Sequence, residues 1–280
     1  MHPVLFRIGS FTIFGYHLGP ITVYTYGVLV ATGVIVGLIL ARWQARKFGL
    51  DPDRIWNVGI YMVLIALLGS KLWLVLGDLP YYLHNPREIL SFSTLQSGGD
   101  IYGGVMFGLA FLLWYVYREK LGYWAVADIF AAPLALGHSI GRLGCFSAGC
   151  CWGKPTTMPW GITFTNPLAA QLVGTPLNVK LQPTELFEAG AEFINFLLLI
   201  WLGRRRNFTG ELAAAWMVLY GTERFIIEFY RNDPGRGMMF HNSFSFMQVV
   251  SLILIFIGGW MFLKHRIRRV STVATETAQN

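Results

Sequence analysis

Long apolar stretches with few charged residues recur along this 280-residue chain. The first, residues 21–41, carries no charge, and a helix of that length spans roughly 30 Å, the thickness of the bilayer hydrocarbon core. Similar stretches follow it as far as residue 263. The pattern therefore predicts an all-α polytopic membrane protein of about seven transmembrane helices, over residues 21–41, 56–76, 101–117, 124–140, 183–202, 212–230 and 244–263.

The composition supports a membrane environment. Charged residues form 13% of the chain and hydrophobic residues 54%, whereas about 25% of the residues of a typical soluble domain are charged. So few charges would not cover the surface of a water-soluble globule, and we therefore expect lipid to solvate much of the chain. The many Trp, Tyr and Phe residues agree, because Trp and Tyr rings favour the bilayer interface.

Lys and Arg are unequally divided between the two alternating sets of connections. One set holds thirteen: Arg42, Arg46, Lys47, Arg54, Arg118, Lys120, Arg204, Arg205, Arg206, Lys264, Arg266, Arg268 and Arg269. The other holds seven: Arg7, Arg87, Arg142, Lys154, Lys180, Arg231 and Arg236. Because cytoplasmic loops carry the excess of Lys and Arg, the N-terminus is predicted outside and the C-terminus in the cytoplasm. The Lys and Arg residues of the predicted cytoplasmic face account for most of the net charge of +7, so no nucleic-acid partner is needed to explain it.

The two ends of the chain carry no further predicted domain. Residues 1–20 lack the charged start, apolar core and cleavage site of a secretory signal peptide, so we expect an outer-face segment leading into the first helix. Residues 270–280 are polar and without aromatic residues, which predicts a disordered cytoplasmic tail. Residues 1–269 are predicted to form a single transmembrane domain.

Charged residues within lipid-embedded segments usually face the protein interior and mark function. The densest group is Tyr220, Arg224, Glu228 and Arg231, whose spacings of four, four and three place them on one helix face. One interpretation is a structural ion pair between Arg224 and Glu228 that holds the bundle together. The other is an anion site in which a carboxylate orients an arginine, because Arg binds phosphate through two parallel hydrogen bonds.

Further polar or glycine-rich positions are predicted at the same membrane face. Arg142 lies in a glycine-rich stretch, residues 137–155, where the backbone can approach a ligand closely. Other such positions near the outer ends of predicted helices are Tyr26, Tyr102, Gly104 and Glu188. We expect all of them to converge in the outer half of the membrane. Arginines, carboxylates and phenols bordered by glycine suit the head group of a phospholipid that enters sideways from the bilayer.

The chain has three cysteines, Cys145, Cys150 and Cys151. They lack the spacing of a zinc site, so we predict no metal site. On the outer face, two of them could form a disulfide and leave one free thiol. A role as small buried apolar side chains is the third interpretation.

Several motifs together resemble those of bacterial prolipoprotein diacylglyceryl transferases, in the family's order and over nearly the whole chain. The first two are Gly98-Gly99-Asp100-Ile101-Tyr102-Gly103-Gly104 and Gly141-Arg142-Leu143-Gly144-x-Phe146-x-x-Gly149-x-x-Trp152-Gly153. The others are Pro183-Thr184-x-Leu186-x-Glu188 and Tyr220-Gly221-x-x-Arg224-Phe225-x-x-Glu228-Phe229-x-Arg231.

The resemblance implies a seven-helix enzyme of the bacterial inner membrane without metal or organic cofactor. Such enzymes transfer diacylglycerol from phosphatidylglycerol to the lipobox cysteine of a prolipoprotein signal peptide, the first step of lipoprotein maturation. The two arginines that are essential in the family correspond to Arg142 and Arg224. The implied catalytic residues are Arg142, Arg224, Tyr102 and Glu228. The implied substrate-binding residues are Tyr26, Gly104, Gly144, Gly149, Gly153, Glu188, Tyr220 and Arg231.

The chain departs from the family pattern at several of these positions. The family commonly has Asn at the position of Cys145 and Glu at that of Cys150, and Phe187 replaces a usual Tyr. Tyr102 stands where a His often serves as the proposed base. Tyrosine ordinarily titrates near pH 10 and histidine at about 6.5, so Tyr102 suits orientation of the head group better than proton removal.

These departures leave two alternatives to the standard reaction. One is a diverged transferase that uses another lipid or acceptor, which the three cysteines favour. The other is a non-catalytic lipid-binding or transport protein.

Overall fold

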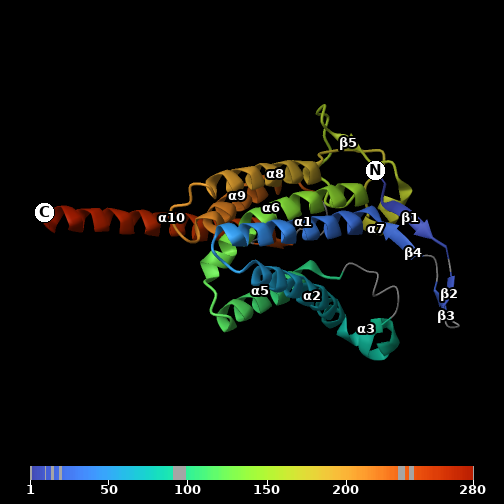
Figure 1. The fold of residues 1–280 in the computed structure, drawn as a ribbon. Coiled ribbons are helices and arrows are strands. Elements are labelled where there is room, and N and C mark those ends of the chain that lie inside the picture. Colours follow the sequence, from blue (N-terminus) through green and yellow to red (C-terminus); the bar gives the residue numbers. More distant parts are fainter. Residues whose placement is uncertain are drawn as a thin grey trace. The chain divides into compact units, whose positions relative to one another are not determined.

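The computed structural model describes residues 2–9, 11–13, 16–18, 21–90, 99–232, 237–239 and 243–279. The chain is mostly helical, and short antiparallel strand pairs lie between the helices (Figure 1). The helices are α1 (Thr25–Lys47), α2 (Pro52–Gly77), α3 (Leu79–His84), the 3₁₀ helix η1 (Pro86–Leu90), α5 (Ile101–Arg118), α6 (Tyr123–Ala148), α7 (Pro167–Val173), α8 (Thr184–Leu202), α9 (Glu211–Ile227) and α10 (Phe246–Gln279). The strands are β1 (Val4–Ile8), β2 (Phe11–Ile13), β3 (Tyr16–Leu18), β4 (Ile21–Tyr24), β5 (Ile162–Thr163), β6 (Lys180–Leu181), β7 (Met238–Met239) and β8 (Phe244–Ser245).

In the described part of the chain, five helices are long and apolar enough to cross a membrane. They are α1, α2, α5, α6 and the segment Phe246–Ile267 of α10. The predicted fifth and sixth spans are also helices, α8 and α9. However, α8 contains three glutamates and α9 has 17 residues, which makes them weaker candidates by composition and by length. The helical membrane class is thus supported, and the count of seven spans stays a prediction.

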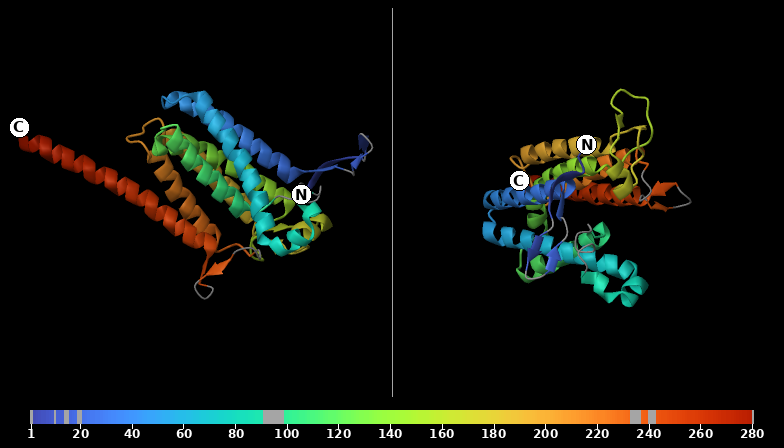
Figure 2. Two further views of the ribbon diagram at one scale, coloured as in Figure 1. Left: turned by 90° about the horizontal axis from the view of Figure 1, so that it is seen from below. Right: turned by 90° about the vertical axis from the view of Figure 1, so that its right-hand side faces the viewer.

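The chain divides into two compact units, which are described separately. The first comprises Met1–Gly37 and Ala127–Asn280, and the second comprises Leu38–Val126. In the first unit α9 packs against both α8 and α10, and the left view of Figure 2 shows α9 in orange beside α10 in red. In the second unit α2 packs along α5. Helix α10 continues through residues 270–279, which the sequence predicts as a disordered tail.

The first helix begins later than predicted. Residues 21–24 form β4, which pairs antiparallel with β1, and the Thr25 backbone N–H donates to Pro3 O at 3.0 Å. The β-branched side chains of Ile21, Thr22 and Val23 favour an extended strand over a helix start. The prediction that residue 21 already belongs to the first span is therefore wrong by four residues.

Close backbone contact between glycines joins α1 to α6 within the first unit. A Cβ atom added to Gly33 would lie 2.7 Å from Gly137 O, and one added to Gly137 would lie 3.1 Å from Gly33 O. Small residues at such crossings let membrane helices approach each other closely. This crossing brings the start of α1 alongside the part of α6 that carries Arg142.

Replacing Gly33 with alanine is expected to destabilise the protein by about 1–3 kcal/mol, because the new methyl group would overlap a backbone oxygen that cannot move alone. Gly27, on the same helix, is the matched control, since an added Cβ there meets nothing within 4 Å in the described part of the chain. Alanine at Gly27 is expected to be neutral or to stabilise the helix by up to about 1 kcal/mol. Thermal unfolding of both variants in detergent measures the difference, and equal effects would contradict the crossing.

The start of α9 is capped by a carboxylate from another helix. Asp128 on α6 is fully buried and accepts hydrogen bonds from the backbone N–H groups of Gly210, at 2.7 Å, and Ala213, at 3.0 Å. Arg206 Nη1 lies 3.2 Å from the same carboxylate. The first N–H groups of a helix have no partner within the helix and favour a nearby negative charge. Asp128 therefore fixes the position of α9 relative to α6.

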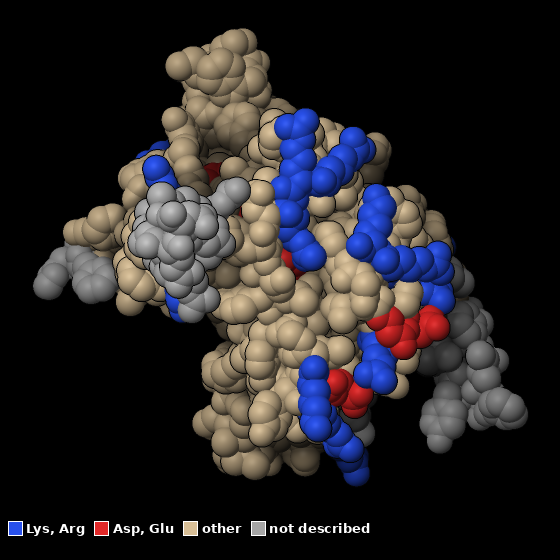
Figure 3. Space-filling model, turned by 60° about the vertical axis from the view of Figure 1, so that its left-hand side comes forward, with Lys and Arg blue, Asp and Glu red and all other residues tan. Residues whose placement is uncertain are grey.

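Lys and Arg side chains are prominent in the view of Figure 3, with fewer Asp and Glu side chains between them. In the second unit, Arg46 and Lys47 end α1 and Arg118 ends α5. Arg54 Nη1, near the start of α2, lies 3.9 Å from Glu119 Oε2. These residues belong to the connections that the sequence assigns to the cytoplasm.

Candidate active site

Helix α8 contributes two buried carboxylates one helical turn apart. Glu188 is 1% exposed and Glu192 is fully buried. Buried charges are costly unless they are paired and hydrogen-bonded. Glu192 has a partner on α6 and Glu188 has partners on both α6 and α9, so the three helices meet around these carboxylates.

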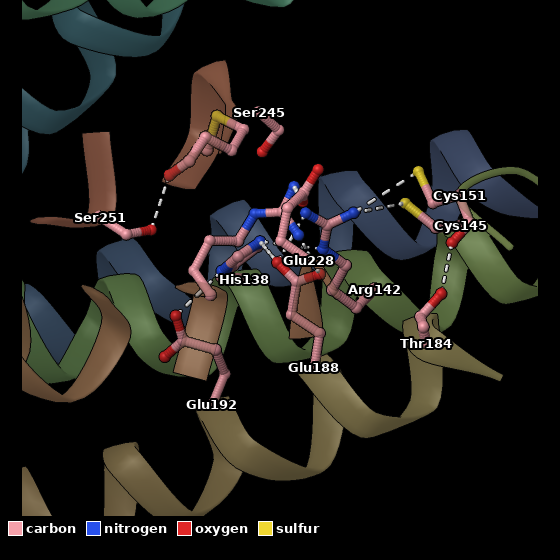
Figure 4. Close-up of polar contacts among 12 residues, drawn as sticks. His138, Arg142, Cys145, Cys151, Thr184, Glu188, Glu192, Glu228, Ser245 and Ser251 are labelled. Carbon is pink, nitrogen blue, oxygen red and sulfur yellow. Dashed lines mark hydrogen bonds and ion pairs between the residues drawn. The ribbon is translucent and has the colours of Figure 1, made fainter. Parts of the chain in front are cut away.

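His138 and Arg142, one turn apart on α6, face these carboxylates (Figure 4). Arg142 Nη2 lies 2.7 Å from Glu188 Oε1, and His138 Nδ1 lies 3.0 Å from Glu192 Oε1. Arg142 Nε donates to His138 Nε2 at 3.1 Å. An accepting Nε2 requires the imidazole proton on Nδ1, which then donates to Glu192. Glu192 thus orients His138, and His138 in turn orients the Arg142 guanidinium.

Helix α9 adds a second buried arginine to the same carboxylate. Arg224 Nη1 lies 3.7 Å from Glu188 Oε2, and Arg224 Nη2 lies 2.8 Å from Glu228 Oε2. The Arg224 side chain is 3% exposed. Glu188 therefore lies between the two arginines that the sequence singles out. Among the described residues, Arg224 Nε has no hydrogen-bond partner, which leaves a buried donor available.

An aromatic pair covers one side of this cluster. Tyr220, one turn before Arg224 on α9, contacts the ring of His138 edge-on with 5.6 Å between centroids. Trp216 stacks on Tyr220 with 5.0 Å between centroids. Tyr220 therefore lies beside the cluster and contacts the ring of His138, and its role in substrate binding stays a prediction.

The predicted helical face does not extend to Arg231. Helix α9 ends at Ile227, with Glu228 as its C-cap, and Arg231 instead forms a backbone bridge with Gly153. The Lys154 N–H also donates to Tyr230 O at 2.7 Å. This pairing turns the chain away from the helix. Gly153 is required at the bridge, since a Cβ there would lie 2.7 Å from Tyr230 O.

The glycine-rich stretch is helical for longer than predicted. The fourth span is predicted to end at residue 140, whereas α6 continues to Ala148 and includes Gly144. A Cβ at Gly144 would lie 3.2 Å from the Tyr26 ring, so this glycine makes room for Tyr26. Gly149 ends the helix with φ of +83°, a conformation that favours glycine.

Two predicted residues, Tyr102 and Gly104, belong to the second unit. Asp100 caps α5 there by accepting a hydrogen bond from the Tyr102 N–H at 2.7 Å. A Cβ at Gly104 would lie 3.2 Å from Ala66 O, so Gly104 serves the close packing of α5 on α2. Their convergence with Arg142 and Arg224 stays a prediction.

The three cysteines form a cluster beside Arg142. Their sulfur atoms all lie within 4.8 Å of one another, and each is a half-buried free thiol. Arg142 Nη1 lies 3.6 Å from Cys151 Sγ and 3.9 Å from Cys145 Sγ. Hydrogen bonding within the cluster is the main cause that lowers the pKa of the Cys151 thiol, and arginine charges act in the same direction.

Sequence reasoning missed His138 and Glu192 as members of the site. His138 lies four residues before Arg142 and Glu192 lies four residues after Glu188, so each shares a helix face with a predicted residue. This spacing is the signal that could have found them.

Comparison with known proteins gives consistent matches. The model of the family described as "Prolipoprotein diacylglyceryl transferase" matches residues 13–264. A phosphatidylglycerol–prolipoprotein diacylglyceryl transferase of Clostridium tetani is 34% identical over 269 residues, which cover 96% of this chain and 100% of the relative. The enzyme of the same name from Solidesulfovibrio magneticus is 33% identical over 88% of this chain and 92% of its own length. A second such transferase of Clostridium perfringens is 32% identical over 85% of this chain and 88% of its own. Because the family model matches most of the chain and these relatives are more than 30% identical to it, the chain belongs to the prolipoprotein diacylglyceryl transferase family.

Proposed function

We propose that this chain transfers the diacylglyceryl group of phosphatidylglycerol to the lipobox cysteine thiol of prolipoproteins. The observation that carries the proposal is the pair of buried arginines, Arg142 and Arg224, that share the carboxylate of Glu188. The space between these two guanidinium groups already accommodates one negatively charged group, the Glu188 carboxylate. Arg224 Nε retains a donor that is suited to a phosphate group, and Arg142 Nη1 donates to the weakly accepting sulfur atoms of Cys151, at 3.6 Å, and Cys145, at 3.9 Å.

The proposed reaction exchanges a C–O bond for a C–S bond. The substrate thiolate attacks the glycerol carbon that bears the phosphate ester, and the electron pair of the breaking C–O bond leaves with glycerol phosphate. The thiol proton passes to a base, because the thiolate is the nucleophile. Arg142 and Arg224 stabilise the charge that builds up on the departing phosphate. No metal or organic cofactor takes part in the proposed reaction.

The remaining predicted residues are proposed to bind the substrates. Glu228 holds Arg224 in position, and Tyr102 orients the head group by hydrogen bonding. The residues proposed to line the lipid and peptide sites are Tyr26, Gly104, Gly144, Gly149, Gly153, Glu188, Tyr220 and Arg231.

The direct test is transfer by the purified protein. Phosphatidylglycerol labelled in its diacylglycerol part is mixed with a peptide that carries a lipobox cysteine, and the peptide is analysed for label. We expect label that depends on both the peptide cysteine and Arg142. A folded protein that binds the lipid but labels no peptide would overturn the proposed acceptor, and would favour a diverged transferase.

We also propose that residues 1–269 form one seven-helix domain in the bacterial inner membrane, with the active site toward the outer face. Buried pairing of the α8 glutamates supports α8 as a membrane-embedded helix despite its charges. The excess of Lys and Arg in alternate connections supports the orientation.

This topology places the C-terminus in the cytoplasm. A reporter that is active only in the cytoplasm, fused after residue 280, is expected to be active, and one that is active only outside is expected to be silent. The reverse pattern would mean that the number of spans or the orientation is wrong. Matched fusions after residue 207, between α8 and α9, separate these two errors, because that connection is also expected to be cytoplasmic. A wrong orientation would place both fusions outside, whereas a miscounted span after residue 207 would place only the C-terminal fusion outside.

A further inference from the structure

We propose that Cys145, Cys150 and Cys151 form a binding site for a thiophilic d¹⁰ cation such as Zn²⁺, next to the arginine site. The three sulfur atoms lie within 4.8 Å of one another. Three sulfur ligands around one zinc at 2.3 Å would lie about 3.8 Å apart in tetrahedral geometry. The cluster therefore needs only a small contraction to bind the cation, and a fourth position remains for water or another ligand.

The backbone conformation brings the three sulfur atoms together. After α6 ends, Gly149 and Cys151 adopt φ values of +83° and +69°, and this left-handed turn folds Cys150 and Cys151 back toward Cys145. The Cys150 N–H donates to Cys145 O at 3.2 Å. A non-glycine residue with positive φ stores strain of about 1 kcal/mol or more, and such strain is concentrated at functional sites.

Side chains from a distant segment fasten the same turn. The Thr184 hydroxyl, at the start of α8, donates to Cys151 O at 2.7 Å. The Thr175 hydroxyl donates to Gly149 O at 2.8 Å. Because both ends of the turn are anchored, the arrangement of the thiols follows from the fold rather than from chance proximity.

The charges also favour a thiolate site. A divalent cation with three thiolates carries a net charge of −1, and the Arg142 guanidinium, which also pairs with Glu188, places positive charge 3.6 Å from Cys151 Sγ. Zinc binding displaces the thiol protons, so the site exchanges protons for the cation with no change in oxidation state. Soft sulfur ligands select Zn²⁺ or Cu⁺ over Mg²⁺ and Ca²⁺.

The spacing of these cysteines explains why the site is not evident from the sequence. Cys145 and Cys150 are separated by four residues and Cys151 follows directly, which is unlike the CxxC pairs of structural zinc sites. Only the two left-handed residues of the turn bring the sulfur atoms together.

The test uses the full-length protein in detergent, reduced and stripped with a chelator. Zn²⁺ binding is measured by competition with a chromophoric chelator, and Co²⁺ serves as a spectroscopic probe whose charge-transfer absorption reports thiolate ligands. We expect one cation per chain, a thiolate–cobalt absorption band, and protection of all three cysteines from alkylation by Zn²⁺. The triple variant Cys145→Ser, Cys150→Ser, Cys151→Ser is expected to lose this binding, whereas Ser147→Ala, in the last turn of α6, retains it.

A single variant keeps the test decisive if the triple variant fails to fold. Cys150→Ser leaves two thiols, so the cobalt charge-transfer intensity is expected to fall by about one third and Zn²⁺ to bind more weakly. The proposal is overturned if the reduced protein binds no Zn²⁺ beyond that bound by the triple variant. It is equally overturned if Zn²⁺ leaves the alkylation of the three cysteines unchanged.

Discussion

Replacement of Arg142 with alanine is expected to lower the rate of diacylglyceryl transfer by roughly 10²–10³-fold, because it removes donors directed at the departing phosphate. The loss should appear in the rate at saturating phosphatidylglycerol, since these donors stabilise charge that develops only in the transition state. The label-transfer assay measures it, with the fraction of protein extracted from membranes as a check on insertion. Full activity in this variant would remove the arginines from the proposed chemistry.

Two control variants separate charge from geometry at Arg142. Arg46→Ala, at the exposed end of α1, removes the same charge far along the chain from the site and is expected to keep full activity. Arg142→Lys restores a charge but not the planar fork that contacts both Glu188 and His138. We therefore expect the lysine variant to recover only a small part of the lost rate.

Replacement of Glu188 with alanine is expected to destabilise the protein by about 3–5 kcal/mol, because removing one partner of a buried ion pair leaves a charge without compensation. Glu188 is 2% exposed in its side chain and neutralises Arg142 at 2.7 Å. Unfolding in detergent measures the effect. Glu185→Ala is the matched control on the same helix, since the oxygens of Glu185 have no hydrogen-bond partner among the described residues, and it should cost much less.

The Glu188 variant also tests whether the two arginines form an anion site. With the carboxylate gone, inorganic phosphate should bind between Arg142 and Arg224 and raise the melting temperature of Glu188→Ala more than that of the unchanged protein. At a phosphate concentration of about 100 times Kd the gain is about 2.7 kcal/mol. Equal responses to phosphate in both proteins would argue against a shared anion position.

The sequence predicted contacts within one helix better than contacts between helices. The Arg224–Glu228 pair follows from a spacing of four residues, and the structure joins the two side chains at 2.8 Å. The bridge from Glu188 to Arg142 and Arg224 depends on how α8 is rotated against α6 and α9, which no local spacing specifies. The contact between His138 and Glu192 depends on the same rotation, although the spacing of four residues already places each of them on a helix face with a predicted residue.

Local patterns failed where the chain leaves a helix. Arg231 has the spacing of the α9 face, but backbone pairing with Gly153 ends the helix before it. The apolar residues of β4 resemble the start of a span, yet they pair with β1. In both places a partner distant in sequence decides the backbone conformation.

The cap that Asp128 places on α9 has a consequence for synthesis of the chain in the membrane. The backbone N–H groups that donate to it, those of Gly210 and Ala213, follow it by 82 and 85 residues. The ribosome therefore delivers α6 to the translocon with a carboxylate that has no backbone partner until α9 emerges. An aspartate within an inserting helix costs up to about 3 kcal/mol. We therefore expect α6 to gain the hydrogen bonds of its buried carboxylate only after α9 arrives, so a translation pause between these helices would prolong an intermediate with an unpaired aspartate.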